Sequence, residues 1–309
     1  MNSRLGLLSA LLLVQLSMVV VALLAPIGRQ NEPSQLVVFD TNEVDRLTIS
    51  DAQTAVELTR DKRNWSVSAV PADVGKVNDF LGKLVNINAP WPVASSRDSA
   101  ERFEVSEENF QRRIRVYRSD NLVADLYLGT SPGYQQVHAR RADQDEVYSV
   151  GLSNYEISVD PDSWLDKSVL AFPEVPSGIE LRLLSDSTES TAVETDTPQS
   201  LSLGDNGWLY NDKAADQEAA AMYANRFTTL RVLGLADASL ASIERGRIML
   251  RDGSGERTLI ISQQLDAGDY LIASTDTGPR YRVATYIAEQ LLMSDADFLA
   301  TQNKNQDLP

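Results

Sequence analysis

An internal repeat constrains this 309-residue chain most, because two copies of one unit must fold in the same way. An offset of 143 residues aligns Trp65 with Trp208. The same offset aligns two apolar stripes at the three-and-four spacing of an amphipathic helix. These stripes are Val77, Phe80, Leu84 and Ile87 in the first copy, and Ala220, Tyr223, Phe227 and Leu230 in the second. Each tryptophan is therefore predicted to precede a helix, with Pro71 in the first turn of the earlier one and Asp212 capping the later one.

Strand-like blocks follow each helix in the same order. Residues 112–129 resemble residues 246–263, with Arg113 and Arg247 matched at an offset of 134, and both alternate apolar and polar residues around a polar turn. Residues 135–150 correspond in the same way to residues 269–283. Such alternation around a turn predicts a β-hairpin for each block. The pairs Trp164-Leu165 and Phe298-Leu299 then predict a short helical end for each copy.

The repeat predicts an α+β protein, in which an N-terminal transmembrane helix is followed by a tandem duplication of a mainly antiparallel sheet-plus-helix domain. Each unit is expected to have two or three strands, one helix, about four further strands and a terminal helical turn. The expected boundaries are an anchor at 1–25, a linker at 26–35, a first domain at 36–172, a second domain at 173–300 and a frayed tail at 301–309.

Residues 5–25 contain no charged side chain and would span about 30 Å as a helix, which matches the apolar core of a bilayer. A cleaved signal peptide usually has a shorter apolar region and a small residue three positions before the cut, where this chain has Leu23. We therefore expect a retained anchor that includes Leu5, Gln15 and Leu24, with Gln15 available to face another membrane helix. The long hydrophilic body is expected to be extracytoplasmic.

Composition narrows the classes of function. The formal net charge of −16 would repel nucleic acid, so no nucleic-acid partner is expected. The chain has no cysteine, which excludes disulfides, thiolate metal sites and a cysteine nucleophile. A single histidine excludes a histidine-based metal site.

Residues 129–133, GTSPG, match the nucleophile-elbow pattern and would make Ser131 a hydrolase nucleophile with His138 as its base. That motif requires a strand followed by a helix, whereas another strand is expected after Pro132. The repeat alignment also places Ile272 at the position of His138. A β-turn and a structural histidine are therefore the preferred interpretation.

No phosphate-binding glycine loop is present, so no cofactor site is expected. The acidic clusters lack the spacing of a calcium loop and are interpreted as solvated turns. They are Asp143, Asp145 and Glu146; Asp160, Asp162 and Asp166; and Asp295 with Asp297. Trp65 and Trp208 are interpreted as core anchors and not as ligand-stacking residues, because both copies place them before the helix.

The order of W-x-V, P-A-D-x-x-K-V-N-x-F-L-x-x-L and D-x-x-x-W-L-D resembles the bacterial family of unknown function numbered 4340. The residues that carry this resemblance are Trp65, Pro71, Ala72, Asp73, Lys76, Val77, Asn78, Leu81, Leu84, Tyr148, Trp164, Leu165 and Asp166. The second copy keeps the order of these blocks but lacks the motif residues at the start of the helix. These positions are mostly structural and supply no active site.

The resemblance implies an accessory protein of gliding-type ABC exporters, with permease and ATPase subunits as partners in the bacterial inner membrane. We therefore expect a noncatalytic, membrane-anchored, periplasmic subunit or scaffold. Two alternatives stay open at this point. One is an independent envelope module that binds glycan or peptide, and the other is a serine hydrolase that uses Ser131.

Overall fold

The computed structural model describes residue 15 and residues 34–89, 91–184, 198–253, 255–265, 268–276 and 278–292. Leu5, Leu24 and the rest of the expected anchor lie outside these residues, except Gln15, which is helical and exposed. In the described part of the chain, no helix is long and apolar enough to cross a membrane. The anchor therefore stays a prediction.

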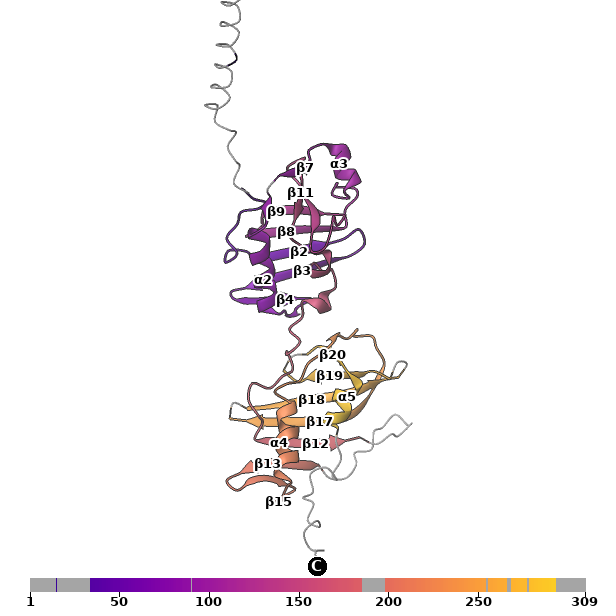
Figure 1. The fold of residues 1–309 in the computed structure, drawn as a ribbon. Helices are drawn as coiled ribbons and strands as arrows, with labels where there is room; N and C mark the ends of the chain where they lie inside the picture. The colour runs from indigo at the N-terminus through magenta and orange to yellow at the C-terminus, as the bar shows by residue number, and fades with distance from the viewer. Residues whose placement is uncertain are drawn as a thin grey trace, which may run out of the picture. The chain divides into compact units, whose positions relative to one another are not determined.

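The first sheet has nine strands, which come from residues 46–150 (Figure 1). From edge to edge they are β5 (Val70–Pro71), β4 (Asn64–Val67), β3 (Ala55–Asp61), β2 (Arg46–Ser50), β8 (Arg112–Arg118), β9 (Asn121–Leu128), β10 (Val137–Arg141), β11 (Val147–Val150) and β7 (Pro92–Ala94). In this spatial order, neighbouring strands pair antiparallel from β5 to β3 and again from β2 through β8, β9, β10 and β11 to β7. A separate pair joins β1 (Ser34–Gln35) to β6 (Asn88–Ala89).

The second sheet also has nine strands, in an equivalent order. They are β15 (Lys213–Ala214), β14 (Gly207–Tyr210), β13 (Gln199–Gly204), β12 (Gly178–Leu183), β17 (Ser242–Asp252), β18 (Gly255–Gln264), β19 (Tyr270–Ser274), β20 (Arg280–Val283) and β16 (Gly234–Leu235). All of these pairings are antiparallel. Two antiparallel sheets with few helices confirm the α+β class, and the shared strand order agrees with the internal repeat.

One helix lies across each sheet, α2 (Val74–Val85) in the first and α4 (Gln217–Arg226) in the second (Figure 1). All eight residues of the two predicted stripes are buried. The helix starts differ from the prediction. Pro71 lies in strand β5, and α4 begins after Asp216, whose carboxylate accepts the backbone N–H groups of Glu218 and Ala219 and caps the helix in place of Asp212.

The predicted hairpins are also present. Strands β8 and β9 are joined at Ser119 and Asp120, whose φ values of 46° and 65° are typical of a tight hairpin turn. Strands β10 with β11, β17 with β18, and β19 with β20 form the other three pairs. Short helical elements also occur at η1 (Asn154–Glu156) and α5 (Thr285–Leu291).

The first copy has a segment that the repeat did not predict. Helix α3 (Arg97–Arg102) and the loop after it connect β7 to β8 and form a small second core. This core contains Ala100, Val105, Tyr127 and Val147, with Ala94, Phe103 and Phe110 packed against it. In the second copy only the short stretch 236–241 separates β16 from β17.

Contacts within the described residues divide the chain into two compact units. One contains residues up to 56 together with 78–159, and the other contains 57–77 together with residues from 160 onward. The second unit contains the backbone bonds between residues 71–73 and 164–166.

Candidate functional site

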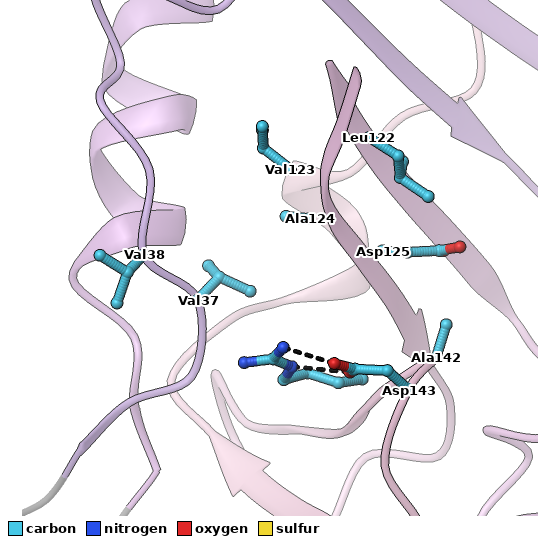
Figure 2. A pocket seen from close by; sticks show the side chains of 9 residues that line it. Val37, Val38, Leu122, Val123, Ala124, Asp125, Ala142 and Asp143 are labelled. Carbon is cyan, nitrogen blue, oxygen red and sulfur yellow. Dashed lines mark hydrogen bonds and ion pairs between the residues drawn. The ribbon is translucent and has the colours of Figure 1, made fainter. Parts of the chain in front are cut away.

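A groove of about 460 Å³ lies beside the start of strand β9 in the first unit (Figure 2). We call it the β9 groove. It is lined by Val37, Val38, Leu122, Val123, Ala124, Asp125, Arg141, Ala142 and Asp143. One wall is thus the segment after β1, and the other is formed by β9 and the turn after β10.

Backbone bonds and burial fix the first wall. The β1–β6 pairing and a 2.9 Å bond from the Leu36 N–H to the Ile87 carbonyl hold this segment against the domain. Val37 is buried, whereas Val38 is 75% exposed. Leu122 on the opposite wall is 49% exposed. The groove therefore presents apolar side chains from both walls.

An ion pair closes the end of the groove at the turn after β10. Arg141 donates from Nε to Asp143 Oδ1 at 2.9 Å and from Nη2 to Asp143 Oδ2 at 2.6 Å, the contacts that Figure 2 draws at Asp143. These hydrogen bonds hold the pKa of Asp143 below its ordinary value and raise that of Arg141. Both groups are therefore charged at neutral pH, and Asp143 is ion-paired with Arg141 within this turn.

Three residues in register across β8, β9 and β10 form what we call the arginine–tyrosine ladder: Arg113, Tyr127 and Arg140. The two guanidinium carbons lie 4.8 Å and 4.9 Å from the centre of the Tyr127 ring. Asp125 accepts two hydrogen bonds from Arg113, at 2.9 Å and 2.7 Å. Burial raises the pKa of the Tyr127 hydroxyl, so it stays protonated at neutral pH.

Ser131 and His138 make separate interactions. The Ser131 hydroxyl donates to the carbonyls of Gly133 and Gln136, at 2.7 Å and 2.6 Å, inside a turn that leads into strand β10 and not into a helix. His138 Nδ1 lies 2.9 Å from Thr130 Oγ1, and its ring stacks against Phe103. Burial lowers the pKa of His138. The geometry is that of a closed turn beside a buried imidazole.

The expected match between His138 and Ile272 is wrong by one residue. Counted from the equivalent residues Ile114 and Ile248, the strand registers place Leu271 at the position of His138. A slip of one residue exchanges the two faces of a strand. The sister residue is still apolar, so the interpretation of His138 as a structural residue is unchanged.

The three residues of the acidic cluster at 160–166 are engaged in local bonds. Asp160 caps the short helix η2 (Pro161–Ser163), Asp162 lies 2.5 Å from Arg282, and Asp166 accepts from Ser168. Asp295 and Asp297 lie outside the described residues. Among the residues that the structure describes, no group of three or more histidine or acidic side chains is placed to hold a metal ion.

Trp65 and Trp208 are both buried, as expected for core residues. The N–H of Ala72 donates to the Trp65 carbonyl at 2.9 Å. Two further backbone bonds connect the start of α2 to the later motif, from Asp73 N–H to Trp164 O at 2.8 Å and from Asp166 N–H to Pro71 O at 3.0 Å. The P-A-D and W-L-D motifs therefore meet in space and form a structural clasp.

Sequence reasoning missed the β9 groove and the arginine–tyrosine ladder. Arg113, Tyr127 and Arg140 lie on three consecutive strands, which the sequence predicted. Which of them stand opposite one another depends on the two hairpin registers. The segment at Val37 and Val38 carried no signal, because its position is set by long-range pairing.

No curated protein and no solved structure matches the chain. One family model matches, and it covers residues 65–245, more than half of the sequence. The matched range includes Trp65 and the clasp formed by the P-A-D and W-L-D motifs. The chain therefore belongs to the family described as Domain of unknown function (DUF4340).

Proposed function

We propose that this protein is a noncatalytic, membrane-anchored accessory subunit or scaffold of an ABC-type transporter complex, with its body on the periplasmic side of the bacterial inner membrane. We further propose that the β9 groove receives a segment of the permease subunit. The supporting observation is the position of the groove, one wall of which, at Val37 and Val38, closely follows the expected anchor.

Chain length limits how far the groove can lie from the bilayer. Nine peptide steps separate residue 25, the end of the expected anchor, from residue 34, where strand β1 begins. An extended chain covers at most about 3.3–3.6 Å per residue, so β1 starts within about 30 Å of the membrane surface if the anchor spans it. The periplasmic face of a membrane partner is within reach of that position.

The groove chemistry favours a polypeptide segment with an apolar side chain. Val38 and Leu122 expose apolar surface on opposite walls, and burying such a side chain stabilises a complex by roughly 1.5–3 kcal/mol. The carboxylate of Asp125 and the guanidinium of Arg141 already have partners across or within the sheet. The groove therefore gains more from apolar contact than from a new ion pair.

The noncatalytic part of the proposal is supported by the two groups that a serine hydrolase would need. The Ser131 hydroxyl donates to carbonyls of its own turn, and the His138 imidazole bonds to Thr130. The Ser131 hydroxyl and the His138 imidazole are therefore not arranged as a nucleophile hydrogen-bonded to its base. Activation of Ser131 would require both sets of bonds to break.

Detergent co-purification of the tagged full chain tests the proposal. We expect permease and ATPase subunits of an ABC transporter to accompany the wild type, and Leu122→Glu to reduce their recovery at least tenfold by placing a charge in the groove. Leu203→Glu is the matched control, since Leu203 is 50% exposed on β13 and lies outside the groove.

The outcome is decided by which proteins co-purify. Recovery of an unrelated partner without any ABC subunit would refute the transporter assignment. Equal recovery with Leu122→Glu and Leu203→Glu would leave the complex in place but would show that the β9 groove is not its contact.

A further inference from the structure

A second pocket, of about 580 Å³, lies under helix α3 on the first sheet. Its lining includes the arginine–tyrosine ladder, Arg113, Tyr127 and Arg140, and an acidic rim formed by Glu107, Glu108 and Asp145. Helix α3 adds Arg97 and Glu101, and the Glu101 carboxylate accepts hydrogen bonds from Ser106 and Asn109. The three rim residues are exposed, whereas Tyr127 and Arg140 are buried. The pocket is thus charged, with a cationic floor and an anionic edge.

Arg140 is the unusual member of this floor, because it is only 8% exposed and carries a full positive charge. Its Nε atom donates to the Val105 carbonyl at 2.7 Å, and its Nη1 atom donates to the carbonyls of Arg141 and Gln144. Among the residues that the structure describes, no carboxylate lies within ion-pair distance of it, and its Nη2 atom has no hydrogen-bond partner. Carbonyl dipoles fix the side chain but do not neutralise its charge.

The neighbouring groups do not remove this imbalance. Arg113 also lies over the Tyr127 ring, but its ion pair with Asp125 leaves that carboxylate engaged away from Arg140. The Tyr127 hydroxyl lines the pocket and has no hydrogen-bond partner among the described residues. A buried guanidinium with a free edge beside a phenol donor matches the planar recognition of a carboxylate or phosphate.

From this geometry we infer that the pocket under α3 binds a small zwitterion. Its carboxylate or phosphate oxygens accept hydrogen bonds from Arg140 Nη2 and the Tyr127 hydroxyl. Its ammonium group faces the acidic rim of Glu107, Glu108 and Asp145. A simple anion satisfies only the first half of the site and is repelled by the rim.

The repeat shows that the fold does not need this arrangement. The strand registers place Ala273 at the position of Arg140 and Ile260 at the position of Tyr127. The second copy also has no counterpart of α3, since β16 and β17 are joined by residues 236–241. The buried arginine and the element that covers it occur together in the first copy.

A purely structural role for Arg140 is the competing explanation, because the Val105 bond ties the α3 loop to the sheet. Arg140→Gln removes both the charge and part of that clamp, so it does not separate the two roles. Tyr127→Phe does, since it removes only the hydroxyl and keeps the ring between the arginines. If Arg140 has only a structural role, Tyr127→Phe should keep normal stability and should not change the response to any ligand.

The test uses the full chain in an uncharged detergent, with thermal unfolding and equilibrium titration as readouts. The probes are glycine, O-phosphoethanolamine, inorganic phosphate and ethanolamine. We expect at least one of the two zwitterions to raise the melting temperature saturably, and inorganic phosphate and ethanolamine, which carry charge of one sign only, to bind at least tenfold more weakly. A response to glycine indicates a carboxylate ligand, and a response to O-phosphoethanolamine indicates a phosphate-bearing headgroup.

Variants identify the site. Tyr127→Phe should weaken binding of the responding zwitterion by about tenfold or more, because a hydrogen bond to a charged group is lost. Arg140→Gln should abolish it. Arg257→Gln is the matched control, since Arg257 also lies over an aromatic ring, that of Phe172, but outside this pocket. It should bind as the wild type does.

Three results would overturn the inference. One is the absence of any stabilisation by both zwitterions. Another is an unchanged response in Tyr127→Phe and Arg140→Gln. The third is binding of inorganic phosphate as tight as that of the zwitterions, which would show that the acidic rim recognises nothing.

Discussion

The Nζ atom of Lys76 lies 4.9 Å from the centre of the Trp164 ring and donates a hydrogen bond to the Ser163 carbonyl at 2.5 Å. Lys76 belongs to the P-A-D-x-x-K part of the family motif, and Trp164 belongs to the W-L-D part. The bridge between Ala72 and Leu165 connects the same two segments. The motif residues therefore hold two distant parts of the chain together.

Truncation of Trp164 should be strongly destabilising, because its side chain is fully buried in this clasp. We expect Trp164→Ala to lower the free energy of unfolding by about 3–5 kcal/mol. Urea denaturation followed by circular dichroism measures the change. Trp91→Ala is the matched control, since Trp91 is 65% exposed, and should stay within about 0.5 kcal/mol of the wild type. Equal losses in the two variants would contradict the clasp.

Gly129 is required by a close backbone contact with the α3 loop. A Cβ atom at this position would lie 2.0 Å from the Phe103 carbonyl oxygen, so Gly129→Ala must displace the loop. We expect a loss of about 1–3 kcal/mol and faster hydrogen exchange in residues 97–111. Gly151→Ala is the control, since nothing lies within 4 Å of its Cβ. Unchanged exchange in Gly129→Ala would show that the contact is dispensable.

The Ser131 hydroxyl should matter for the turn and not for catalysis. Ser131→Ala removes its bonds to the carbonyls of Gly133 and Gln136, and we expect a loss of about 1 kcal/mol. The wild type should not react with a fluorophosphonate probe, because the hydroxyl donates to two backbone carbonyls and not to a base. Covalent labelling that disappears in Ser131→Ala would instead support the hydrolase alternative.

His138 should make stability depend on pH below about 6.5. Burial lowers its pKa in the folded state, so the unfolded chain binds the proton more readily. The resulting stability is fully present above the unfolded pKa of about 6.5 and is lost as pH falls towards the lower folded pKa. Carboxylates whose pKa is lowered in the folded state, such as Asp143, add their losses only at more acidic pH.

Replacement of His138 by the residue of the sister strand tests this dependence. His138→Leu removes the titrating group and places leucine where the second copy has Leu271. We expect the urea midpoint of the variant to change less between pH 7.5 and about pH 5 than that of the wild type. An identical pH profile in the two proteins would show that another group is responsible.

Local patterns in the sequence predicted the elements that depend on neighbouring residues. The stripe from Val77 to Ile87 is buried, and the hairpin at Ser119 and Asp120 lies where a polar turn interrupts two alternating runs. The repeat also indicated that both sheets would share one strand order. Periodicity and turn chemistry act over a few residues, so the sequence displays them directly.

Tertiary structure alone decided the features that depend on register and long-range pairing. The residue equivalent to His138 shifted by one position, which no alignment with sparse identities could have detected. Arg113, Tyr127 and Arg140 became neighbours because two hairpin registers place them opposite one another. The β9 groove exists because the segment at Val37 is held beside β9 by pairing with residues about fifty positions later. Side-chain neighbours across strands are set by the register of the whole sheet, which the order of residues along the chain does not encode locally.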